Sequence, residues 1–428
     1  MSGNRWRIPI GGLILGVACT LPALAADEPK PEAPKPETTV DSSDPTKGFV
    51  TFKSGDNSLT LGAWGQFRAT VDDREQFDGD TVGSGLGKED GTSTSFSIPR
   101  LRLYLQGTAF KPWMRYKVEI EVANLKTDTV TNLNNGRITD GYVEFAKSPY
   151  ATVRVGQYKV PFGMQQLVPD TRQEFVDRSI ADAKFAPARD VGVMLLGQFF
   201  DKKFGYQASV VNGGGQNNPQ DDRGVMYGAR IVYDPLGEYK LVEGATDNPE
   251  KNVLHFGVAY RGGEVPRGLA TVGNFEDPND ETAFGVEIAW KYKRFFAMGE
   301  YYKQTDEQAN PTVGPDIDAN GYHAQFGVFV QPKKQELALR YASIEPDDSI
   351  VDAKQTEARL VYGYYWVGHN MKLQADLGQI TFGQNFSTLS ALALRGVSPG
   401  LAAANRLVTL PGQELSDKQL RVQFVLAF

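Results

Sequence analysis

From residue 48 to the C-terminus, apolar and polar residues alternate with a period of two. In one such segment, Leu103 and Leu105 alternate with Arg102, Tyr104 and Gln106. Because successive side chains of a β-strand point to opposite faces, this pattern puts the apolar residues of a segment on one face. The pattern predicts sixteen strands, at residues 59–72, 98–110, 113–124, 138–146, 150–159, 190–200, 204–212, 225–234, 253–260, 283–291, 295–302, 321–330, 335–342, 356–365, 370–379 and 419–428.

The two faces of these segments separate a membrane barrel from a soluble protein. No charged residue lies on an apolar face, with segment 295–302 set aside because its phase is ambiguous. A soluble sandwich buries one face against a second sheet, so this many strands would need several domains joined by linkers, and no such linkers are present. The sequence therefore predicts an all-β fold, a transmembrane antiparallel up-and-down β-barrel of about 16 strands over residues 48–428.

The connections between the predicted strands alternate in length, as a barrel with periplasmic turns and extracellular loops requires. The short connections are 111–112, 147–149, 201–203, 292–294, 331–334 and 366–369. The long ones are 73–97, 125–137, 160–189, 213–224, 261–282, 303–320, 343–355 and 380–418. Segment 235–252 is the exception, because it is long on the side where a short turn is expected.

Aromatic residues mark the membrane boundary and the chain end. Trp113, Trp290 and Trp366 lie beside predicted short turns, where an aromatic girdle meets the periplasmic interface. The chain ends in an alternating strand whose last residue is Phe428. A terminal Phe resembles the signal read by the outer-membrane barrel assembly machinery, so that machinery and outer-membrane lipid are expected partners.

The N-terminal residues predict an export signal followed by a tether. Residues 1–26 have a charged start, an apolar stretch and a small-residue cleavage site, which predicts a signal peptide cleaved on export through the inner membrane. A membrane anchor, or lipid attachment at Cys19, is the alternative. Residues 27–47 alternate proline, acids and lysine, which predicts a disordered periplasmic tether. The expected location is the cell outer membrane.

Composition excludes several classes of protein. With 45 Lys and Arg against 52 Asp and Glu, the chain has a net charge of −7, which argues against nucleic-acid binding. The single Cys and three scattered His offer no metal-ligand spacing, so we expect no metal, no cofactor, no catalytic residues and no enzyme activity. A structural or partner-binding barrel that anchors the envelope remains an alternative, and a barrel hydrolase is a more remote one.

Four stretches resemble a known family: ITDGYVEF at 138–145, RVGQYKVPFG at 154–163, ARDVGVMLLG at 188–197 and VVNGGG at 210–215. They are similar to the phosphate-selective porin O and P family of Gram-negative outer membranes. The resemblance implies a homotrimer of sixteen-stranded barrels. It also implies a pore in which arginines and a lysine cluster attract and pass small anions, phosphate in particular.

Phosphate selectivity would need several guanidinium or ammonium groups in a narrow passage with few competing carboxylates. The predicted inward faces supply the pore-lining basic residues Arg68, Arg100, Arg102, Arg115, Lys117, Arg154, Lys159 and Arg230. Later strands add Arg340, Arg359, Lys372 and Arg421. The alternative is that these charges solvate a water channel and pair with Glu119, Glu121, Asp140 and Glu144.

The long connection 160–189 is the candidate constriction loop, since its stretch TRQEFVDRSIADAKF is helix-like and could fold into the barrel. Its basic residues Arg172, Arg178, Lys184 and Arg189 are matched by Asp170, Glu174, Asp177 and Asp182. This balance predicts a water-filled channel for passive diffusion of small solutes, with a modest anion preference and no tight phosphate binding.

Overall fold

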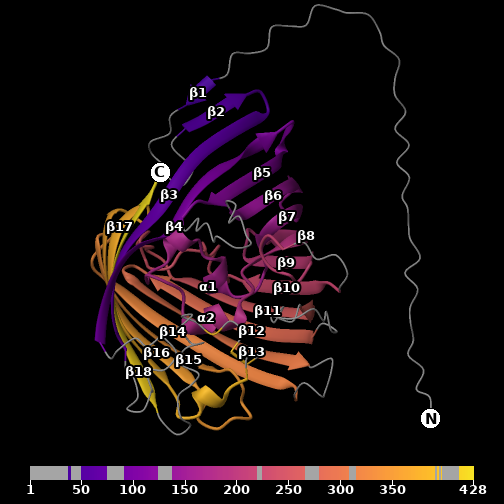
Figure 1. The fold of residues 1–428 in the computed structure, drawn as a ribbon. Helices are drawn as coiled ribbons and strands as arrows, with labels where there is room; N and C mark the ends of the chain where they lie inside the picture. The colour runs from indigo at the N-terminus through magenta and orange to yellow at the C-terminus, as the bar shows by residue number, and fades with distance from the viewer. Residues whose placement is uncertain are drawn as a thin grey trace, which may run out of the picture. The chain divides into compact units, whose positions relative to one another are not determined.

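The computed structural model describes residues 37–39, 50–74, 91–123, 137–218, 224–265, 279–307, 315–390, 393–394, 397 and 414–428. Each strand from β3 to β18 pairs antiparallel with the next one along the chain, and β18 pairs back with β3 (Figure 1). The sheet is therefore a closed barrel of sixteen strands, which confirms the predicted fold class. Closure leaves no free edge in the wall, so the backbone hydrogen bonds of neighbouring strands satisfy each other.

The barrel strands agree closely with the predicted segments and are mostly longer at the ends that meet the long connections. They are β3 (Asn57–Arg74), β4 (Gly91–Ala109), β5 (Lys111–Glu121), β6 (Arg137–Ser148), β7 (Ala151–Lys159), β8 (Arg189–Phe199), β9 (Phe204–Val211), β10 (Met226–Tyr233), β11 (Val253–Val265), β12 (Asn279–Tyr292), β13 (Phe295–Glu307), β14 (Ile317–Gln331), β15 (Gln335–Glu345), β16 (Gln355–Val367), β17 (Met371–Phe382) and β18 (Leu415–Ala427).

Two short strands precede the barrel. β1 (Glu37–Thr39) pairs with β2 (Val50–Ser54), and β2 pairs with the start of β3. β1 therefore lies inside the segment predicted to be a disordered tether. The predicted signal peptide, Cys19 and most of the tether lie outside the described residues.

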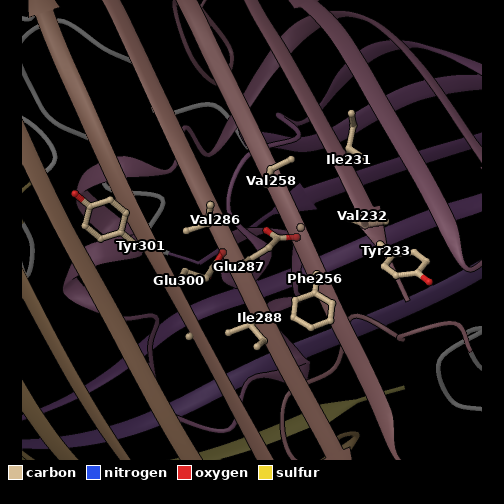
Figure 2. Close-up of a pocket in the computed structure, with 12 residues that line it drawn as sticks. Ile231, Val232, Tyr233, Phe256, Val258, Val286, Glu287, Ile288, Glu300 and Tyr301 are labelled. Carbon is tan, nitrogen blue, oxygen red and sulfur yellow. The ribbon is translucent and has the colours of Figure 1, made fainter. Parts of the chain in front are cut away.

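The alternation of the sequence appears as two faces of the wall. On β4, Leu103 is 51% exposed on the outer face while Arg102, its neighbour, is 7% exposed on the inner face. On β10 to β13 the outward side chains line one apolar depression (Figure 2). These outward residues are Ile231, Tyr233, Phe256, Val258, Val286, Ile288 and Tyr301. Apolar side chains that face outward from a barrel wall suit contact with lipid.

The strand with ambiguous phase, β13, carries large apolar side chains on both faces. Phe296, Met298 and Tyr302 point inward and are buried, while Phe295 and Tyr301 lie on the outer face. These three inner residues are apolar because they pack against segments folded into the lumen rather than against water. Glu300 lies on the same inner face and accepts the backbone N–H of Gln165 in the loop at 2.9 Å. This packing explains why alternation alone could not set the phase.

The long connection from β7 to β8 folds inside the barrel, as predicted. It contains α1 (Met164–Leu167), the 3-10 turn η2 (Asp170–Arg172) and α2 (Ile180–Phe185), and Figure 1 shows α1 and α2 within the ring of strands. The helix-like stretch is thus only partly helical. The Ser179 side chain caps α2 by accepting a hydrogen bond from the Asp182 N–H at 3.1 Å.

Small residues on the inner wall allow this loop to approach closely. Phe162, Ile180 and Phe185 of the loop form a buried cluster with the inner faces of β11 to β15. The wall contributes four alanines to that cluster, namely Ala259, Ala283, Ala319 and Ala342. The loop therefore packs closely against the inner faces of β11 to β15 through apolar contacts. Among the described residues, none of the helices has the length and hydropathy that a membrane-spanning helix needs.

Candidate functional site

Two polar cavities lie against the inward-folded loop. The first, called here the Arg421 cavity, has a volume of about 380 Å³ and is lined by Arg100, Asp177, Arg178, Arg359 and Arg421 among others. The second, called here the Arg154 cavity, has a volume of about 250 Å³. Its charged lining consists of Arg102, Lys117, Glu119, Asp140, Arg154, Lys159, Asp170 and Arg189. Basic residues predicted from sequence therefore converge on these two spaces.

Three arginines of the wall converge on one carboxylate of the loop. Asp177 lies 2.8 Å from Arg68 of β3, 3.2 Å from Arg100 of β4 and 2.9 Å from Arg421 of β18. Arg68 binds it through both terminal nitrogens, at 2.8 and 3.0 Å. Although burial opposes ionisation, these arginines hold the pKa of Asp177 well below its usual range. The carboxylate is therefore an anion at every physiological pH and compensates the arginines around it.

The arginine cluster continues along β15 and β16. Arg359 donates to Glu357 at 2.7 Å and to Asp376 at 2.8 Å, and Arg421 reaches Asp376 at 2.9 Å. Arg340 donates to Glu357 at 2.9 Å and to the backbone carbonyl of Asp177 at 2.8 Å. Cations and carboxylates thus alternate along the wall of the Arg421 cavity.

Arg102 attaches the loop to the wall. Its guanidinium lies 2.8 Å from Asp170 of the loop and also binds Glu119 at 3.0 Å and Glu121 at 2.9 Å. The other oxygen of Asp170 lies 2.7 Å from Arg178. Despite burial, Arg178, Arg100 and Arg102 hold the pKa of Asp170 well below its usual range. Asp170 therefore forms ion pairs both with Arg102 of the wall and with Arg178 of the loop itself.

The Arg154 cavity has a similar mixture of charges. The carboxylate of Asp140 forms ion pairs with Lys117 at 2.5 Å and with Arg189 at 2.7 Å. Arg154 lies 2.6 Å from Glu144, with its guanidinium carbon 4.4 Å from the centre of the Tyr142 ring. The pairing with acidic residues that the sequence left open is thus realised at most of these cations.

Several predicted site residues have other surroundings. Lys159 donates to the carbonyls of Gln166 and Val168 at 2.7 and 3.0 Å, so it binds the loop backbone as well as lining the Arg154 cavity. Arg230 pairs with Glu287 and lines neither cavity. Arg115 is exposed and opposite Glu144 in the strand register.

The four basic residues assigned to the constriction loop also divide. Arg178 lines the Arg421 cavity, whereas Lys184 is buried and donates to the carbonyl of Ala393 at 2.8 Å. Arg189 is the first residue of β8 and belongs to the wall rather than to the loop. Arg172 ends the 3-10 turn and its backbone carbonyl accepts the N–H of Glu243.

A buried polar cluster away from these cavities was not predicted from the sequence. It joins Glu174 of the loop, Glu243 of segment 235–252, and Gln325 of β14. Burial, together with the nearby carboxylates of Glu336 and Glu243, raises the pKa of Glu174 well above its usual range. The available signal was the unexpected length of segment 235–252. Among the described residues, no group of His, Cys, Asp and Glu side chains is arranged to hold a metal ion.

Solved structures share the fold. An anion-selective porin from Comamonas acidovorans has a TM-score of 0.57 at 15% identity, covering 86% of this chain and 100% of that one. The outer membrane channel DcaP of Acinetobacter baumannii has a TM-score of 0.52 at 13% identity, covering 89% of this chain and 99% of that one. The trimer form of OmpT from Vibrio cholerae has a TM-score of 0.50 at 13% identity, covering 86% and 99% of the two chains.

Sequence comparisons identify the family as well as the fold. An uncharacterized protein of Aquifex aeolicus is 22% identical over 262 residues, which span 55% of this chain and 61% of that relative. The family model for phosphate-selective porin O and P matches residues 72–381, which include thirteen of the sixteen barrel strands in full, together with the inward-folded loop. The chain belongs to the phosphate-selective porin O and P family.

Proposed function

We propose that this outer-membrane porin passes small anionic solutes by diffusion along the arginine-lined side of its lumen. The observation that carries the proposal is the convergence of Arg68, Arg100 and Arg421 beside a cavity of about 380 Å³. Fixed guanidinium groups in a narrow passage attract anions more strongly than the same groups in bulk water, because less solvent screens them.

The expected preference is modest, and phosphate is not held tightly. Each of the three arginines already binds Asp177, and Arg102 binds three carboxylates, so an arriving anion meets compensated cations. Lys184 of the loop is directed to a backbone carbonyl, which removes one cation from the passage. The family name by itself therefore does not require tight phosphate binding in this member.

Assembly and export complete the proposal. We infer that residues 1–26 direct export, that the terminal strand is read by the barrel assembly machinery, and that three chains form a trimer. The trimer is supported by the trimeric form reported for a protein of the same fold. The apolar outer face gives each barrel a surface suited to lipid or to a neighbouring barrel.

Reversal potentials of single channels in planar bilayers under a salt gradient test ion preference. The unmodified protein should favour anions, and Arg100→Glu should shift the reversal potential toward cations. Lys53→Glu, on exposed β2, is the control and should have little effect. Millimolar phosphate should block chloride current only weakly. A cation preference in the unmodified protein would refute the proposal, and block at micromolar phosphate would refute the weak binding.

A further inference from the structure

The connection between β10 and β11 is long at the end of the barrel where other connections are short, and it folds into the lumen. Tyr239 and Ala245 of this segment, residues 235–252, are buried in one cluster with Met164 of the constriction loop. The same cluster includes Phe296 and Phe329 from the inner wall. The segment therefore occupies space between the wall and the loop rather than closing a hairpin at the surface.

The tip of this segment is bonded directly to the loop. The Glu243 N–H donates to the carbonyl of Arg172 at 3.0 Å, and the Glu174 N–H donates to the Glu243 carboxylate at 2.8 Å. The Gln165 side-chain amide donates to the other carboxylate oxygen at 3.1 Å. Gln165 in turn accepts the N–H of Ser179 at 2.9 Å. One glutamate thus connects to both the first and the second half of the loop.

The same tip is fixed to the wall. The Gln325 amide of β14 donates to Glu243 at 3.1 Å, and His369 lies 2.9 Å from the Glu243 carbonyl. Lys291 of β12 donates to the carbonyl of Val242 at 2.6 Å. Glu243 is fully buried. Removal of its carboxylate would therefore leave the buried groups that donate to it without a hydrogen-bond partner.

The backbone at the tip permits this close contact. Gly244 has φ of +70°, a left-handed conformation that suits glycine. A Cβ built on Gly244 would lie 2.8 Å from the Glu336 carboxylate of β15. The local geometry therefore requires a residue without a side chain immediately after Glu243.

We propose that segment 235–252 is a positioning element that holds the constriction loop in the lumen, with Glu243 as the residue that joins them. The inference rests on the proposed channel function and assigns the segment a role in setting the width and steadiness of the passage. Glu243 acts through the loop and does not itself contact a permeating solute. Releasing it should leave ion preference to the arginines while freeing the loop to move.

The test combines single-channel recording with thiol labelling of the loop. Ala181 is fully buried on α2, and removal of residues 1–26 leaves a chain without cysteine, so Ala181→Cys is a specific reporter. In that background, Glu243→Ala should raise the rate of maleimide labelling about tenfold or more, because several buried hydrogen bonds are lost. It should also increase current noise and conductance. Reversal potential should change little.

A matched control comes from the same segment. Glu238→Ala removes a glutamate that is exposed and paired with Lys202 at 3.0 Å, so it should alter neither labelling nor conductance. Glu243→Gln keeps the size of the side chain but replaces one accepting oxygen, and it should give an intermediate effect. It is the variant to measure if Glu243→Ala fails to fold.

The outcomes separate the two proposals. The positioning role would be overturned if folded Glu243→Gln and Glu243→Ala matched Glu238→Ala in labelling rate, current noise and conductance. Absence of channels in the unmodified protein would instead refute the proposed function.

Discussion

The carboxylate of Asp177 lies 2.8 Å from the guanidinium of Arg68, although the two residues are 109 positions apart. The contact joins the tip of the inward-folded loop to the first barrel strand, and Arg100 and Arg421 share the same carboxylate. The loop therefore places its own anion among the arginines to which the proposed function assigns the attraction of anions. The number of arginines alone does not set the field in the lumen, because the loop compensates part of it.

Asp177→Asn should increase anion preference. The substitution keeps the shape of the side chain but removes the charge that compensates three arginines, so anions should enter more readily and phosphate should block chloride current at lower concentration. Reversal potential and block of single-channel current measure both effects. Asp201→Asn, in an exposed short turn, is the matched control. An unchanged reversal potential in Asp177→Asn would show that this cluster does not govern selectivity.

Arg102→Gln should destabilise the folded barrel. The change leaves Asp170, Glu119 and Glu121 without their shared cation, and breaking a buried ion pair from one side costs about 3–5 kcal/mol. Urea unfolding in lipid vesicles measures the loss. Arg115→Gln, at an exposed position on the neighbouring strand, should change the free energy of unfolding by much less. Equal effects of the two substitutions would contradict the role given to Arg102.

Leu103→Arg should be costly because it places a charge on the lipid-facing side of β4. Leu103 is 51% exposed on the outer face, and arginine near the midplane of a bilayer costs about 2–4 kcal/mol in such barrels. Gln106→Arg, three residues away on the inner face, should be tolerated. The free energy of unfolding in vesicles distinguishes them, and similar losses would mean that the two faces have been assigned incorrectly.

Asp182→Asn should remove part of the pH dependence of stability. Burial raises the pKa of Asp182 to about 7, with Glu300 adding to the shift and Arg178 opposing it. Between about pH 4 and the folded pKa, the unfolded chain releases this proton while the folded chain keeps it, so stability falls as pH rises. The variant cannot ionise and should gain stability relative to the parent at about pH 8 but not at about pH 4.

The midpoint of thermal unfolding at the two pH values is the measurement. Glu174 gives a slope of the same sign in both proteins, so the difference between parent and variant isolates Asp182. A difference that is the same at both pH values would contradict the assigned pKa.

Deleting Phe428 should impair assembly into the outer membrane. The backbone of Phe428 exchanges hydrogen bonds with Ala63 of β3, at 2.8 and 2.5 Å, so the last residue also takes part in closing the barrel. Leu420→Ala, on the outer face of the same strand, is the control. The amount of folded, heat-modifiable protein in outer-membrane fractions measures assembly. Parent levels of folded protein in the deletion variant would count against the assembly signal.

The strands, their number and nearly all of their phases follow from the residue pattern alone. These features are local, since alternation over ten residues fixes which side of a strand faces lipid, and the inward position of Arg68, Arg100 and Arg102 follows from it. The one ambiguous phase is that of β13, where apolar inner residues pack on segments folded into the lumen. Apolar residues on both faces remove the alternation from which the phase is inferred.

The partners of those side chains depend instead on how the connections fold within the closed barrel. Asp177 pairs with Arg68 and Arg421, Lys184 donates to the carbonyl of Ala393, and the carboxylate of Glu243 accepts the N–H of Glu174. These contacts depend on where three connections lie, namely those that follow β7, β10 and β17. These contacts join residues from 69 to 244 positions apart and depend on the volume left by the inner wall. A strand pattern carries no information about that volume, because it exists only after the sixteenth strand has paired with the first.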